Sequence, residues 1–139
     1  MIHQATQKIA DMLTEKNFKY DILEDENGSR VICGINGKCI TYRVQFVSTD
    51  EDNDVAVRAF DLVKFPEEKQ TDMIIFANEC NMKYRYLKFD VNCKDNTFQA
   101  EYDLPVRSQN PGEIAFEILV RMMRILDDIG ADMMRRVWA

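Results

Sequence analysis

The stretch of sequence that decides the fold reads FPEEKQTDMIIFANECNMKYRYLKFDVNCKDNTFQAEYDLP and spans residues 65–105. Pro66 favours a helix start, because its fixed φ suits a first helical turn, and two glutamates follow where the helix dipole favours anions. Four residues supply the predicted core-facing stripe of this helix, namely Met73, Ile74, Ala77 and Cys80. Asn81 is the candidate left-handed cap at its end.

Two strands of alternating character follow this helix. The apolar residues predicted for the first strand are Tyr84, Tyr86, Leu87, Phe89 and Val91. A turn at Lys94-Asp95-Asn96 separates them from those of the second strand, which are Phe98, Ala100, Tyr102 and Leu104. Pro105 prevents an ordinary continuation of the ladder. The segment therefore predicts a helix followed by an antiparallel hairpin.

The flanking sequence adds two helices and four strands. Residues 2–17 carry apolar side chains at helical spacing, and Asn110-Pro111-Gly112-Glu113 is a competent opening for a last helix that runs nearly to Trp138. The four strands are predicted around residues 18–22, 30–35, 40–46 and 55–63. The order is helix, four strands, helix, two strands, helix. We therefore predict an α+β fold with an antiparallel sheet and three helices, in a single domain over residues 1–139.

Asn36-Gly37 is a strong signal for a two-residue hairpin turn with positive φ at both positions. That turn would pair Ile35 with Lys38, and Cys33 with Ile40. Cys39 would then lie on the opposite side of the sheet from Cys33, because successive side chains alternate. The prediction is that the four cysteines, Cys33, Cys39, Cys80 and Cys93, stay reduced.

Charge and hydropathy exclude several classes of partner. The net charge of −6 and the pI near 4.8 repel a phosphate backbone, and no stripe of cations interleaved with aromatics compensates, so we expect no nucleic acid. No apolar run approaches the roughly 20 residues of a membrane span, so we expect no membrane partner. The N-terminus Met1-Ile2-His3-Gln4 turns polar at once, which predicts a cytoplasmic protein.

Metal and cofactor sites are not expected either. The cysteines form no C-x-x-C pair and the chain has one histidine, so the usual zinc spacings are missing. Asp50, Asp52 and Asp54 have the alternate spacing that begins a calcium loop, but Val55 stands where that loop needs glycine. We interpret residues 49–54 as a solvated acidic turn.

No constellation for catalysis is present. His3, the single histidine, falls on or before the first helical turn, where we expect it to be exposed and without a fixed partner. The sequence has no phosphate loop, no dinucleotide fingerprint and no nucleophile elbow. Asp127 and Asp128 are neighbours on a helix and face different directions. We predict a protein that is not an enzyme, with a catalyst of unrecognised site as the least favoured alternative.

The segment resembles YbjN-type domains, a family of bacterial regulators of sensory transduction. The resemblance rests on the proline-opened helix, the Asn78-x-x-Asn81 exit, the two alternating strands and the closing Asp103-Leu104-Pro105. It extends over nearly the whole chain and is clearest from residue 60 to residue 105, although the turn at 94–96 lacks the glycine often found there. The resemblance implies the fold of type III secretion chaperones and a role as a regulator or adaptor.

The last helix is the candidate interaction surface. At 100° per residue its core-facing arc is already filled, and the apolar flank beyond that arc consists of Phe116, Val120, Met123, Met134 and Trp138. Glu117 with Arg121 and Arg124 with Asp128 form predicted i,i+4 pairs on its polar stripe. We expect this flank to bind a protein partner, in particular a second copy in a homodimer. The alternative is that the first helix or a loop covers it within the monomer.

Two non-enzymatic functions therefore remain open. One is an adaptor or regulatory module that binds a protein partner, and the other is a dedicated secretion chaperone that binds an unfolded client segment.

Overall fold

The structure, a computed structural model, describes residues 1–50, 54–106 and 110–138. The elements follow the predicted order, helix, four strands, helix, two strands, helix, so the α+β prediction is confirmed. The first five elements are α1 (Gln4–Glu15), β1 (Asp21–Asp25), β2 (Gly28–Asn36), β3 (Thr41–Ser48) and β4 (Asp54–Lys64). The remaining elements are a 3-10 turn η1 (Glu67–Lys69), α2 (Gln70–Lys83), β5 (Lys88–Asn92), β6 (Thr97–Pro105) and α3 (Pro111–Trp138).

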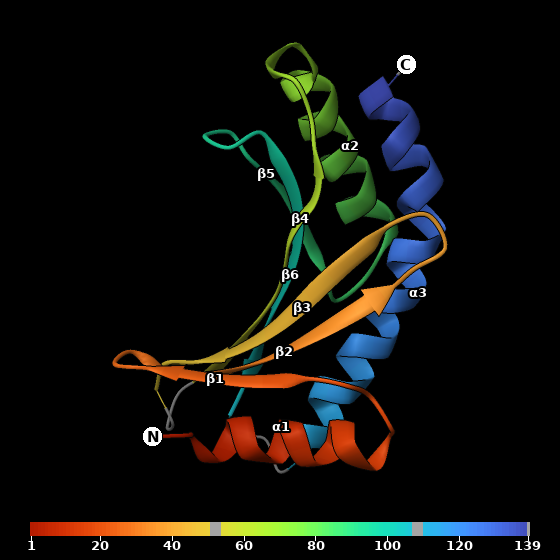
Figure 1. Cartoon of the computed structure of the whole chain (residues 1–139). Coiled ribbons are helices and arrows are strands. Elements are labelled where there is room, and N and C mark those ends of the chain that lie inside the picture. The colour runs from red at the N-terminus through yellow and green to blue at the C-terminus, as the bar shows by residue number, and fades with distance from the viewer. Residues whose placement is uncertain (51–53, 107–109, 139) are drawn as a thin grey trace.

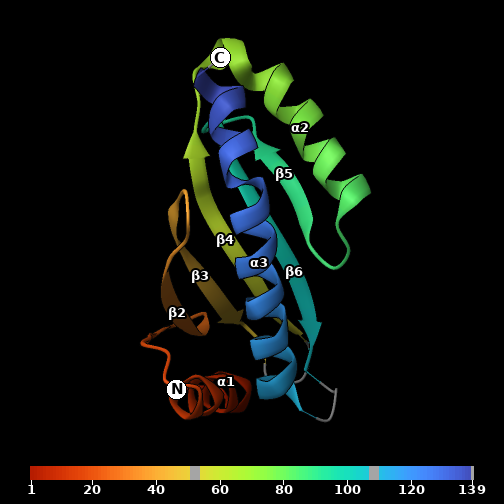
Figure 2. The same ribbon diagram turned by 90° about the vertical axis from the view of Figure 1, so that its right-hand side faces the viewer.

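The six strands form one antiparallel sheet in the order β1-β2-β3-β4-β6-β5. Because α2 is inserted between β4 and β5, β6 returns to pair with β4 and β5 becomes an edge strand. The three helices lie on one side of the sheet (Figures 1 and 2), and α3 runs along the sheet between α1 and α2. The other side of the sheet carries no helix.

Alternation along the strands places the hydrophobic core on the helix side of the sheet. In β3, Tyr42, Val44 and Phe46 are buried, whereas Thr41 and Arg43 on the opposite face are exposed. Burial of these apolar faces against the helices is the main stabilising term of the fold. The largest fully buried side chains come from α1, the sheet, α2 and α3, and include Leu13, Phe46, Met73, Phe89, Phe98, Leu119, Met122 and Leu126.

Two asparagines with positive φ close the local turns. Asn17, with φ of 63°, follows α1, and the amides of Asn17 and Phe18 donate to the carbonyls of Thr14 and Leu13, which is a Schellman motif. Asn96, with φ of 56°, takes the left-handed position in the β5–β6 turn. Asparagine tolerates this conformation better than other non-glycine residues, which explains how the turn forms without glycine.

The hairpin between β2 and β3 corrects the sequence prediction. Asn36 pairs with Thr41 and Cys33 with Val44, and neither Asn36 nor Gly37 has positive φ. The turn therefore spans residues 37–40 rather than two residues, and the predicted register was wrong. The reason is a contact distant in sequence: the amide of Lys38 donates to Asp127 Oδ1 of α3 at 2.8 Å.

The packing of this hairpin tip on α3 depends on a glycine. A Cβ added at Gly130 of α3 would lie only 3.0 Å from the Cβ of Cys39, so Gly130 makes room for the tip. Cys33 is buried and Cys39 is exposed, and none of the four cysteines is joined to another in the structure.

Several boundaries and contacts also differ from the prediction. The helix predicted from Pro66 begins as the 3-10 turn η1, and α2 proper starts at Gln70 and continues past Asn81 to Lys83. Tyr84, Tyr86 and Leu87 precede β5 instead of belonging to it, and Tyr86 has φ of 75°. Asn81 is not a left-handed cap, because α2 continues beyond it and its φ is not positive. Its side-chain amide bonds to the next strand instead.

His3 was predicted to have no fixed partner, and that prediction was wrong. Its Nδ1 lies 2.8 Å from Ser48 Oγ, and its backbone amide donates to Ser29 Oγ at 3.0 Å. Thr6 Oγ1 lies 2.8 Å from the same Ser29 hydroxyl. These bonds fix the start of α1 against β2 and β3, because the buried hydroxyls need partners inside the protein.

Candidate protein-interaction surfaces

The outward face of α2 carries an apolar strip that no other described element covers. Ile74 and Ile75 are 45% and 49% exposed and Met82 is 81% exposed. Thr71 and Asn78, on the same face of the helix, add polar groups without charge. We call Thr71, Ile74, Ile75, Asn78 and Met82 the α2 strip. Contiguous apolar exposure of this kind marks protein contacts more often than isolated surface leucines do.

Ile74 was predicted to face the core, and the structure corrects this. Met73, Phe76, Ala77 and Cys80 face the core instead, and the ring of Phe76 lies 5.5 Å from that of Phe98 on β6. A signal for the strip was present in the sequence. Met73-Ile74-Ile75-Phe76 is a run of four apolar residues, and at 100° per residue four consecutive side chains cannot all point inward.

The loop between α2 and β5 extends this surface towards α3. The guanidinium of Arg121 lies 4.6 Å from the ring centre of Tyr86, which is half exposed, and Arg121 also pairs with Glu117 at 2.7 Å. The Tyr84 hydroxyl donates to Asp128, which raises the pKa of Tyr84 in addition to the effect of burial. Asp128 also lies 3.9 Å from Lys83 at the end of α2, so the predicted pair of Asp128 with Arg124 is replaced by contacts with Lys83 and Tyr84.

The flank of α3 predicted as an interaction surface is partly covered within the monomer. Phe116 packs edge-to-face against Phe18 at 5.5 Å, and Lys16 lies 5.6 Å from its ring centre. Phe116, Val120, Met123 and Met134 are half-buried, whereas Trp138 is 74% exposed. The structure thus places the five residues on one side of α3, with the segment after α1 against its first turns.

The helix-free face of the sheet holds a cluster of charges on β4, β5 and β6. Arg58 lies 3.0 Å from Glu101 and 2.8 Å from Asp103, and Lys88 lies 2.6 Å from Glu101. Burial and a hydrogen bond with Glu101 raise the pKa of Asp90 to about 6. Burial would raise the pKa of Glu101 as well, but hydrogen bonds from Lys88 and Asp90 and the charge of Arg58 lower it. This network ties three strands together.

Neither of the two buried cysteines is an activated thiol. Burial raises the pKa of Cys33, and burial and the charge of Glu79 raise that of Cys80 to about 11, so both thiols are protonated near neutral pH. Asp127 and Asp128 have different partners, Lys38 and Tyr84, and do not form a shared site.

Among residues 1–50, 54–106 and 110–138, no three potential metal ligands gather in one place. Asp52, in the acidic turn examined for calcium, lies outside the described residues. None of the described helices is long and apolar enough to span a membrane.

The fold is α+β, with three helices on one side of a six-stranded antiparallel sheet. The chain belongs to the YbjN family, whose model, described as "Putative bacterial sensory transduction regulator", matches residues 6–129. This match confirms the resemblance seen in the sequence. No curated protein matches the sequence.

Two solved structures are similar in fold. An uncharacterized protein from Methanothermobacter thermautotrophicus superimposes with a TM-score of 0.65 at 13% identity, over 96% of this chain and 99% of that one. A chain of the HopA1-SchA chaperone-effector complex superimposes with a TM-score of 0.54 at 10% identity, over 88% of this chain and 91% of that one. At such identities the likeness concerns the fold.

Proposed function

We propose that this chain is a cytoplasmic, non-enzymatic interaction module of the regulatory or adaptor kind, and that it acts by binding a protein partner. The observation that carries the proposal is the α2 strip, where three large apolar side chains lie open to solvent and the charge of the neighbouring Glu79 is paired with Arg136 of α3. Such a surface releases water on association, and methionine adapts its shape to the partner. The YbjN family description supports a regulatory role.

Self-association is part of the proposal. A net charge of −6 makes two copies repel each other. A homodimer is therefore favoured where the contact surface carries no charge. The five residues of the α2 strip are uncharged. The α3 flank of Phe116, Val120, Met123, Met134 and Trp138 is the second proposed contact. Its exposed end at Trp138 provides a large aromatic anchor.

The alternative function is a chaperone for an unfolded client segment. It is supported by the likeness of fold to a chain of a chaperone-effector complex. The two functions differ in the state of the partner: an adaptor binds a folded protein, whereas a chaperone keeps its client extended.

Co-purification tests the proposal and separates the two functions. The immobilised chain should retain a specific protein, and Met82→Glu should abolish its capture because a charge is introduced into the contact. Lys8→Gln is the matched control, because it changes the net charge by the same single unit on α1. A captured partner that resists limited proteolysis identifies an adaptor, and one that is cleaved throughout identifies a chaperone. Equal capture by wild type and Met82→Glu would refute the assignment of the α2 strip.

A further inference from the structure

The helix-free face of the sheet contains a groove that the proposed contacts do not use. Two adjoining hollows share Gly34 and Arg43; one extends over β1 and β2 to Leu23, and the other extends to Phe60 on β4. A Cβ added at Gly34 would meet no atom within 4 Å, so the floor of the groove is open above this glycine. Leu23 is 50% exposed and Phe60 is 42% exposed at its two ends.

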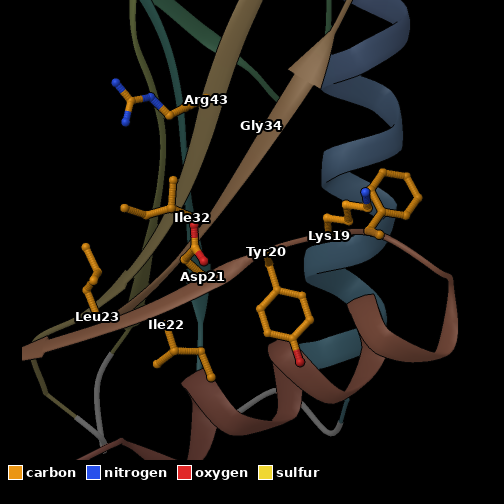
Figure 3. Close-up of a pocket in the computed structure, with 9 residues that line it drawn as sticks. Lys19, Tyr20, Asp21, Ile22, Leu23, Ile32, Gly34 and Arg43 are labelled. Atoms are coloured by element: carbon orange, nitrogen blue, oxygen red, sulfur yellow. The ribbon is translucent and has the colours of Figure 1, made fainter.

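Figure 3 shows on which side of the sheet the side chains near the edge strand β1 lie. Arg43, Ile32, Asp21 and Leu23 lie on the helix-free side, whereas Ile22 and Tyr20 point towards α1. The Tyr20 hydroxyl bonds to Thr14 on α1, which holds β1 from its other side. The groove is therefore formed by residues of β1, β2, β3 and β4, which are neighbours in the sheet.

The charged side chains in the groove lack the ion pairs that several other charged side chains on this face form. Elsewhere Arg30 pairs with Asp25, and Arg58 and Lys88 pair with Glu101. Among the residues that the structure describes, the side chains of Asp21 and Arg43 make no hydrogen bond or ion pair, and the same holds for Lys19 and Asp61, which also line the two hollows. One strand carries an anion and another a cation, with Ile32 and Gly34 between them.

The register fixes the separation of these two charges. Asp21 faces Ile32, Gly34 is two residues further along β2, and Gly34 faces Arg43. Strands lie about 4.8 Å apart and rise about 3.3 Å per residue, so the two Cα atoms are roughly 12 Å apart. An extended chain covers that distance in about four residues, and its side chains at positions 1, 3 and 5 face the same way.

We propose that this groove binds an extended segment of the protein partner with a basic residue over Asp21, an acidic residue over Arg43 and an apolar residue midway, above Gly34. The inference rests on the proposed function and adds the kind of sequence that the partner presents. The two opposite charges select both the composition and the direction of the segment, because a reversed segment brings like charges together. A guanidinium binds a carboxylate through two parallel hydrogen bonds, which favours the acidic residue at Arg43.

The test uses a displayed library of random heptapeptides selected on the full chain. The expected result is enrichment of peptides with a basic and an acidic residue four positions apart and an apolar residue between them. Arg43→Glu should weaken capture of a selected peptide by about tenfold or more, and a peptide whose acidic residue is replaced by lysine should restore it. A merely structural role for Arg43 would not produce this exchange of specificity.

Gly34→Leu provides a second variant. The open space above Gly34 accommodates the larger side chain, so the variant should unfold no more readily than wild type while peptide capture is lost. Selection that yields no such pattern, or capture that persists in both variants, would overturn the groove assignment. Met82→Glu measured on the same peptides separates the proposals, since it should leave peptide capture intact even where it abolishes contact through α2.

Discussion

Asn81 offers a sharp test of how α2 and β5 are joined. Its side-chain amide donates to the Phe89 carbonyl at 2.9 Å and accepts from the Phe89 amide at 2.7 Å. Phe89 lies on an edge strand, so the asparagine takes the place that a neighbouring strand would occupy. Asn81→Ala removes both bonds. Each contributes about 1 kcal/mol, and the gain in helix propensity returns up to about 0.7 kcal/mol, so the net loss should be about 1.3 kcal/mol.

Asn78→Ala is the matched control for this substitution. Asn78 lies three residues earlier on α2 and makes only a 3.8 Å contact with the sulfur of Met82. The same gain in helix propensity should stabilise this variant by up to about 0.7 kcal/mol. Urea unfolding at one protein concentration should therefore separate the two variants by about 2 kcal/mol. Equal free energies of unfolding for both variants would refute the role assigned to the amide.

Three further outcomes are expected. Asp90 has a pKa raised to about 6, above its ordinary value of 3.8, so its stabilising effect is complete below about pH 4 and is lost as the pH rises through 6. The difference in thermal stability between Asp90→Asn and wild type should accordingly shift in favour of the variant as the pH rises from 4.5 to 8. A difference that does not change with pH would contradict the raised pKa of Asp90. Gly28→Ala should destabilise the protein by at least about 2 kcal/mol, because φ is 145° and the added Cβ would lie 2.1 Å from the Ser48 carbonyl oxygen. Gly34→Ala should instead stabilise it by about 0.5 to 1 kcal/mol. Similar unfolding midpoints for the two variants would contradict both predictions. Unfolding curves with EDTA or with a reducing agent should superimpose on the untreated curve, and a drop of several degrees would show a metal or a disulfide.

The sequence was sufficient to predict the order of the elements, because apolar periodicity and turn residues are local signals. Asn17 and Asn96 show this well, since Asn17 follows α1 and Asn96 lies in the β5–β6 turn, where the sequence indicates them. Contacts between distant segments were not predictable in this way. The turn after Asn36 is set by the bond from Lys38 to Asp127, 89 residues away.

The candidate surfaces also combine features that local sequence predicts with features that depend on distant contacts. Periodicity located the apolar flank of α3, but it does not reveal that Phe18 packs on Phe116. On α2 the choice between Ile74 and Phe76 for the core depends on the position of Phe98, which comes from another part of the chain. The apolar run on α2 therefore indicated that some of its side chains are exposed, but only the fold shows which ones.

Sedimentation velocity of wild type and Ile75→Glu over a range of concentrations tests whether the α2 strip is a contact surface. Ile75 is 49% exposed, so a glutamate there should leave the free energy of unfolding of the monomer, measured at a dilution where wild type is dissociated, within about 0.5 kcal/mol of wild type. We expect a wild-type dimer that dissociates on dilution, a monomer for Ile75→Glu and an unchanged dimer for Lys8→Gln. A wild type that stays monomeric at every concentration and retains no partner, or an Ile75→Glu protein that associates like wild type, would contradict it.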